Sequence, residues 1–60
     1  MDEKKLKVFA EALDERKLIT EMPQASTADR VYYQAMVQSA GYLGYEVRVD
    51  ENGKHKLIKM

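Results

Sequence analysis

The chain has 60 residues, with ten basic and ten acidic side chains, one histidine and no cysteine. Its zero formal charge argues against a strongly nucleic-acid-binding domain, and the lack of cysteine excludes disulfides, iron–sulfur clusters and thiolate zinc sites. We therefore expect no metal, no cofactor and no small-molecule substrate. No apolar run reaches the roughly 18 residues of a membrane span, so we predict a cytoplasmic protein without membrane contact.

A chain of this length makes one domain, residues 1–60, with one small core. Apolar burial and chain entropy nearly cancel at this size, so small domains need a disulfide, a metal, a partner or very good packing. With disulfides and metals set aside, packing and association remain.

The first predicted element is an amphipathic helix over residues 2–17. Asp2 is placed to cap it, and the residues that follow are mostly strong helix formers. One apolar stripe recurs at helical spacing and consists of Leu6, Phe9, Ala10 and Leu13. Acidic side chains at positions 11, 14 and 15 argue against a basic membrane-surface helix, so this stripe predicts one buried face.

The segment after Lys17 allows two interpretations. Either the helix continues through Glu21, or it breaks near Lys17 and the apolar pair Leu18 and Ile19 packs under the connection. Pro23 sets the outer limit, because the residue before a proline is biased away from helical conformation. Both interpretations place a short connection between two roughly antiparallel helices.

The second predicted helix covers residues 26–40. Ser26 and Asp29 have the spacing of a capping box, and Gly41 can take the left-handed conformation that ends a helix. Apolar residues occupy two sides of this helix: a main stripe that includes Val31 and Ala35, and a second stripe at Tyr33, Val37 and Ala40. A helix with two apolar sides is usually buried on both.

A β-hairpin is predicted over residues 45–60. Apolar residues alternate with polar ones from Leu43 to Val49, and Asn52-Gly53 is a strong signal for a type I′ turn. This turn pairs Val47 with Ile58 and places Asp50 beside His55. A register shifted by one residue, with a bulged turn, would bring Leu57 inward in place of Ile58.

These elements define an α+β fold: two antiparallel helices followed by a C-terminal β-hairpin (ααββ) that packs on the second helix. A lone hairpin is marginal in water, so it requires such a surface. The predicted core consists of Leu6, Phe9, Leu13, Val31, Ala35, Val47 and Ile58.

The second stripe of the central helix is either covered by the hairpin or left for another copy or a partner. Tyrosine is frequent at interfaces, and it also closes the rim of small cores. The candidate protein-interface residues are Tyr32, Tyr33, Met36, Val37 and Tyr42.

No catalytic arrangement is evident. Asp50 and His55 form a nominal dyad at the hairpin tip, where a solvated ion pair is the simpler interpretation. We predict a non-enzymatic binding module with a regulatory or adaptor role that self-associates, of a size common among phage and mobile-element proteins. The alternative is a small nucleic-acid-binding regulator that uses the hairpin as a wing or β-ribbon, through Arg48, Lys54, Lys56 and Lys59.

Overall fold

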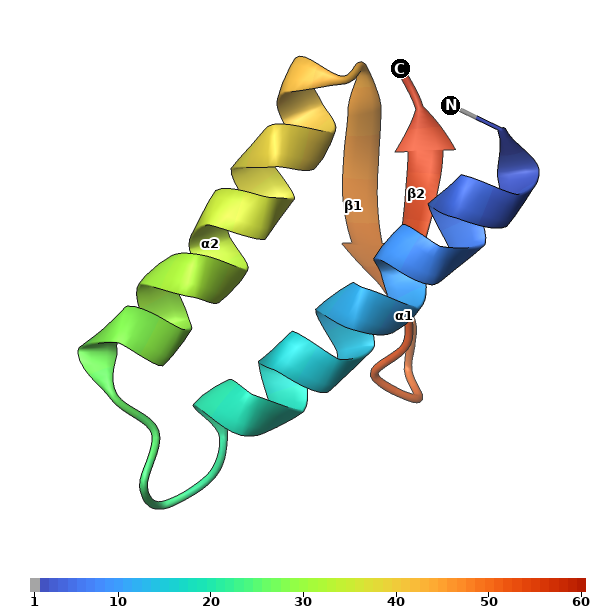
Figure 1. The fold of residues 1–60 in the computed structure, drawn as a ribbon. Coiled ribbons are helices and arrows are strands. Elements are labelled where there is room, and N and C mark those ends of the chain that lie inside the picture. Colours follow the sequence, from blue (N-terminus) through green and yellow to red (C-terminus); the bar gives the residue numbers. More distant parts are fainter. Residues whose placement is uncertain (1) are drawn as a thin grey trace.

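The computed structural model describes residues 2–60 and contains two helices followed by two strands (Figure 1). In chain order these are α1 (Glu3–Thr20), α2 (Thr27–Tyr42), β1 (Tyr45–Val49) and β2 (His55–Lys59). The two strands form one antiparallel sheet. The predicted ααββ architecture is therefore confirmed.

Helix α1 begins where its capping residue predicts. The Asp2 carboxylate accepts a hydrogen bond from the backbone N–H of Lys5 at 2.8 Å. The helix does not break near Lys17 but continues through Leu18 and Ile19 to Thr20, which is the longer of the two predicted forms.

Helix α2 begins with the predicted capping box. The backbone N–H of Asp29 donates to the Ser26 hydroxyl, and the backbone N–H of Ser26 donates to the Asp29 carboxylate. The predicted end at Gly41 is wrong, because Gly41 lies inside the helix. Gly44, with φ of 90°, takes the left-handed conformation just after the capping residue Leu43 and directs the chain into β1.

The hairpin adopts the shifted register. Val47 lies opposite Leu57 and Val49 lies opposite His55, so the prediction that paired Val47 with Ile58 and Asp50 with His55 is wrong. Because side chains alternate between the two faces of a strand, this shift turns Leu57 and His55 toward the helices and Ile58 outward.

The turn explains the shift. Among residues 2–60, glycine alone has positive φ, which excludes a type I′ turn at Asn52-Gly53. Instead, the backbone N–H of Gly53, with φ of 81°, donates to the carbonyl of Asp50, and that of Asp50 donates to the carbonyl of Lys54. This is the bonding of a loop in which a turn is followed by one left-handed glycine.

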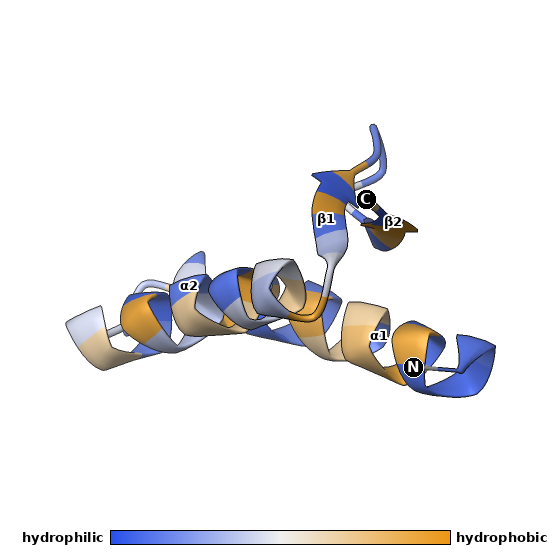
Figure 2. Cartoon of the chain, turned by 90° about the horizontal axis from the view of Figure 1, so that it is seen from above, coloured by the Kyte–Doolittle hydropathy of each residue, from blue (hydrophilic) through white to orange (hydrophobic). Residues whose placement is uncertain are grey.

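The helices form one layer, and the hairpin lies on only one side of that layer (Figure 2). The hairpin contacts both helices: β1 packs against α2, as predicted, and β2 packs against α1. Among residues 2–60, no helix is long and apolar enough to cross a membrane.

The core is small. Leu13 and Ala40 are the fully buried apolar residues of the described chain. Around them lie Phe9 of α1, Leu43 at the C-terminal cap of α2, Tyr45 of β1 and Leu57 of β2. Leu6, Phe9 and Val47 are half-buried. The prediction that Val31, Ala35 and Ile58 belong to the core is wrong: Val31 and Ala35 lie away from the hairpin, and Ile58 is turned outward by the register.

Candidate functional site

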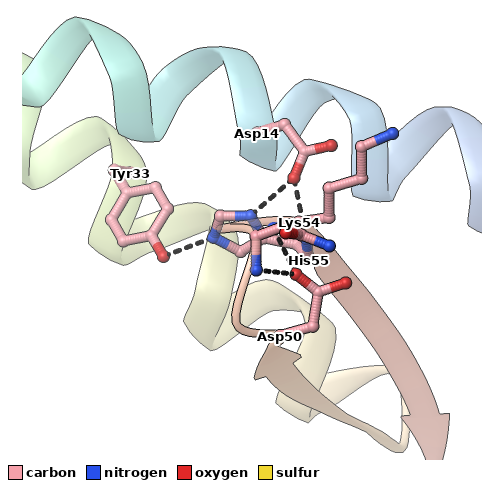
Figure 3. A network of polar contacts seen from close by, with 6 residues as sticks. Asp14, Tyr33, Asp50, Lys54 and His55 are labelled. Atoms are coloured by element: carbon pink, nitrogen blue, oxygen red, sulfur yellow. Dashed lines mark hydrogen bonds and ion pairs between the residues drawn. The ribbon is translucent and has the colours of Figure 1, made fainter.

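Three polar side chains from three elements meet beneath the hairpin (Figure 3). Asp14 comes from α1, Tyr33 from α2 and His55 from the first position of β2. The observed register places His55 on the side of the hairpin that packs on the helices, where its side chain is 0% exposed. We call these residues the Asp14–His55–Tyr33 cluster.

His55 uses its backbone N–H and both ring nitrogens in this cluster. Its backbone N–H and its ring Nδ1 lie 2.7 and 2.8 Å from the same oxygen, Oδ1 of Asp14. Its Nε2 lies 2.8 Å from the Tyr33 hydroxyl, and the two rings meet edge to face with centroids 5.7 Å apart. The cluster therefore ties the hairpin to both helices.

The electrostatics of the cluster define where its protons lie. The backbone N–H of His55 lowers the pKa of Asp14, and the hydrogen bond and charge of the His55 ring act in the same direction. Asp14 is thus an ionised acceptor, so Nδ1 of His55 carries a hydrogen. In the neutral ring Nε2 then accepts the hydroxyl hydrogen of Tyr33.

This arrangement resembles the orienting half of a catalytic Asp-His pair, but the His55 ring itself is not free to exchange a proton with a substrate. The buried ring has both nitrogens occupied. Burial, followed by the charge of Asp14, raises the pKa of Tyr33, which makes its hydroxyl a poorer nucleophile near neutral pH. The contacts of the cluster therefore hold the hairpin on both helices.

Asp50 is not part of the cluster, contrary to the predicted solvated pair with His55. Its carboxylate accepts hydrogen bonds from the backbone N–H groups of Asn52 and Lys54 at 2.9 and 3.0 Å. Asp50 thus stabilises the turn. The role of Asp14 was missed because it lies 41 positions before His55 in the sequence. In the sequence, only the alternative hairpin register indicated that His55 could face the helices and meet such a residue.

The predicted interface residues lie on different sides of α2. Tyr33 and Val37 line a groove together with Val47 and Val49 of β1, so the hairpin adjoins them. Met36 is half-buried. Tyr32 and Tyr42 are exposed, and the guanidinium of Arg16 lies 4.0 Å from the centre of the Tyr32 ring.

The residues predicted to contact nucleic acid lie on two different faces of the hairpin. Arg48, Lys54 and Lys56 share the outer face of the hairpin, and Arg48 lies directly opposite Lys56. Lys59 pairs with Tyr45 and belongs to the other face. The guanidinium of Arg48 also forms an ion pair with Glu46 at 3.2 Å.

Within residues 2–60, no group of three or more metal-ligating side chains is arranged to hold a metal ion. No family model, no curated protein and no solved structure matches the chain.

Proposed function

We propose that this protein is a small non-enzymatic binding module that self-associates through the side of its helical layer turned away from the hairpin. Such a module suits a regulatory or adaptor role. The lack of cysteine supports a reducing compartment such as the cytoplasm.

The proposed interface consists of apolar positions on both helices. On α2, positions 31, 35 and 42 lie roughly half a turn from Tyr33 and Val37, which adjoin the hairpin. On α1, positions 8 and 12 lie opposite Asp14, which bonds the hairpin. We call this surface the open helical face, and it consists of Val8, Ala12, Val31, Ala35 and Tyr42.

Four of the five side chains of the open helical face are exposed, and Ala12 is half-buried. Val8 is 61% exposed, Val31 55% and Tyr42 88%. The hairpin lies on only one side of the helical layer (Figure 2), and the α2 positions of this face lie about half a turn from the residues that adjoin it. Exposed apolar side chains gathered on one side of a protein are typical of interaction sites.

The main support for this proposal is the total solvent-exposed surface area of the chain. The chain exposes 4739 Å², whereas surface scaling gives about 4,000 Å² for a folded monomer of its mass. The excess of about 700 Å² approaches the roughly 800 Å² that each partner buries in a stable interface. A second copy is the occupant that supplies a matching apolar face, because a two-fold contact buries the same surface in both chains.

Solution mass tests this proposal. Light scattering is expected to give a dimer for the wild type, and Val31→Glu is expected to give a folded monomer, because it places two charges in a two-fold interface. Ile58→Glu is the matched control: it introduces the same charge at an exposed apolar site on the outer face of the hairpin and should remain dimeric. A monomeric wild type at millimolar concentration would show that the open helical face is not a self-association surface.

The second candidate function is nucleic-acid binding through the outer face of the hairpin. Like charges directly across a ladder are destabilising, so the opposition of Arg48 and Lys56 favours an anionic partner such as phosphate. Titration with a DNA duplex at two salt concentrations tests it. Affinity that falls steeply with salt, and falls again in Lys56→Glu, would support this function.

A further inference from the structure

The two outer edges of the hairpin differ in how their outward backbone groups are hydrogen-bonded. On β2, the outward N–H of His55 is occupied by the Asp14 carboxylate of α1. On β1, the bonded pairs of an antiparallel ladder alternate, and the backbone bonds at Gly44–Met60 and Asp50–Lys54 fix that alternation. The backbone groups of Tyr45, Val47 and Val49 therefore point away from β2.

These outward groups are available for hydrogen bonding. Among residues 2–60, no backbone or side-chain group bonds the outward N–H and C=O of Val47 or Val49, and β2 is the sole strand paired with β1. Proteins usually cover such an edge or shield it, because it is a template for another strand. In this protein α1 occupies one outward group of the β2 edge, the N–H of His55, whereas the outward groups of Val47 and Val49 on the β1 edge have no partner among residues 2–60.

A groove lies between the open edge and α2. Its volume is about 380 Å³, and its walls are Val47 and Val49 on β1 and Tyr33, Gln34, Val37 and Gln38 on α2. In Figure 1, α2 and β1 diverge from their connection near Gly44, so the helix stands beside the strand without covering its edge. Valine side chains supply an apolar surface, and the two glutamines supply amide donors and acceptors on the helical wall.

One end of the groove is positively charged. A second hollow of about 300 Å³ shares Tyr33 and Gln34 with the groove and is also lined by Lys17 and Arg30. Glu21 lines the same hollow and leaves one net positive charge there. The groove therefore complements a ligand that is apolar along its length and negatively charged at one end.

We propose that an extended peptide segment of a partner protein, with apolar side chains at alternate positions and a carboxylate at one end, binds this groove as a third strand beside β1. Its backbone would bond the outward groups of Val47 and Val49, as in other cases of strand addition to a sheet edge. Every second side chain would enter the groove, since side chains alternate along a strand. The carboxylate would lie near Lys17 and Arg30.

A second copy of this chain fits the groove less well than such a peptide. Its own β1 carries Glu46 and Arg48, which pair with each other and leave no net negative charge for Lys17 and Arg30. Tyr33 and Val37, the apolar α2 residues of the groove, lie about half a turn from the open helical face, and Gln34 and Gln38 lie between the two. Peptide binding and self-association therefore use different apolar residues of α2.

The test begins with eight-residue random peptides displayed on phage and selected against the intact protein. A selected peptide, synthesised and titrated by NMR, is expected to shift the backbone amide signals of Tyr45, Val47 and Val49. Enriched sequences are expected to alternate apolar residues and to carry an acidic residue or carboxylate at one end. Failure to enrich any peptide, or shifts centred on the open helical face or the outer hairpin face, would overturn the proposal.

Two variants sharpen the test. Val47→Pro removes an outward N–H without removing a β1–β2 bond and should weaken peptide binding about tenfold, the factor for one lost hydrogen bond. Arg30→Glu reverses a charge at an exposed site and should weaken peptide binding about fivefold. This variant tests the proposal even if the proline variant is poorly folded. Lys56→Glu makes the same reversal outside the groove and should change affinity less than twofold.

Equal losses in Arg30→Glu and Lys56→Glu would mean that binding follows overall charge and not the groove, and would overturn the proposal. The dimer-disrupting Val31→Glu variant separates this proposal from self-association. It should bind the selected peptide as the wild type does. If peptide addition changes the mass of the protein, and this change requires Val47, the event is β1–β1 pairing between two copies rather than binding of the peptide as a strand.

Discussion

His55 is the residue through which the hairpin makes its polar contacts with the helices. Its backbone N–H and ring Nδ1 share one oxygen of Asp14, and its Nε2 contacts the Tyr33 hydroxyl. A buried polar group without a partner is costly, so each member of the cluster depends on the others. The hairpin is thus held by a network in which single substitutions leave unsatisfied groups.

Asp14→Ala should reveal this dependence. The substitution removes the acceptor for two hydrogen atoms of His55, both on the buried side of the hairpin, and should cost about 2 kcal/mol or more. Each kcal/mol shifts Tm by roughly 4–8 °C in a domain of this size, so thermal unfolding followed by circular dichroism will detect it. Glu11→Ala, an exposed carboxylate on the same helix, should change stability by less than about 0.5 kcal/mol. Equal effects of the two substitutions would contradict a special role for Asp14.

The same carboxylate predicts an acid limit of stability. The pKa of Asp14 lies below its ordinary value of 3.8, first because the backbone N–H of His55 donates to it. A carboxyl with a depressed pKa stabilises the fold above its unfolded pKa, and this stabilisation is lost as pH falls through the folded pKa. The free energy of unfolding should therefore fall as pH drops below about 4.

Asp14→Asn should flatten this acid limb in a series of melts at different pH. A residual slope is expected from Asp29, whose pKa is lowered by the hydrogen bonds that it accepts from Ser26. An acid limb as steep in Asp14→Asn as in the wild type would assign the pH dependence to other carboxyls.

At the scale of elements, the glycines on either side of the α2 terminus have opposite roles. Gly41 lies inside the helix with no atom within 4 Å of the position of an added Cβ, so Gly41→Ala should stabilise the protein by about 0.5–1 kcal/mol. Gly44 has φ of 90°, which disfavours any side chain, so Gly44→Ala should destabilise it by about 1 kcal/mol. Urea unfolding of the two variants measures both, and equal signs would place the end of α2 elsewhere.

The elements themselves were predictable because their signals are local. The Ser26–Asp29 box, the Asp2 cap and the alternation from Tyr45 to Val49 each act within a few residues. The hairpin register was not predictable in the same way. The dipeptide Asn52-Gly53 fits either a type I′ turn or a turn followed by a left-handed glycine, and the choice shifts every cross-strand pair.

The hairpin register also determines which residues form the candidate site. In the predicted register His55 faces solvent beside Asp50, whereas in the observed one it enters the core and meets residues from both helices. No local sequence pattern indicates that Asp14 accepts hydrogen bonds from His55, because an acidic residue on an amphipathic helix normally faces water. Contacts between distant segments depend on packing, which local sequence patterns do not encode.

At the scale of the whole molecule, the placement of the hairpin leaves the protein with two unfilled surfaces. One is the open helical face, where Val8, Val31 and Tyr42 are exposed. The other is the groove between α2 and the free edge of β1. The first is broad and apolar and fits a second copy. The second is narrow and has unpaired backbone groups, which fit a single extended strand.

Self-association through the open helical face links stability to protein concentration. A dimer that forms from folded chains stabilises them by mass action, so Tm should rise as concentration increases. The effect should be large for this protein, because two fully buried apolar side chains provide little stability to the isolated chain. Melts at concentrations spanning about two orders of magnitude will measure the rise, which is expected to reach several degrees. Val31→Glu should melt at one temperature across the whole series, and at a lower one than the wild type. A wild-type Tm that is independent of concentration would mean that the chain reaches its full stability as a monomer with the open helical face exposed to water.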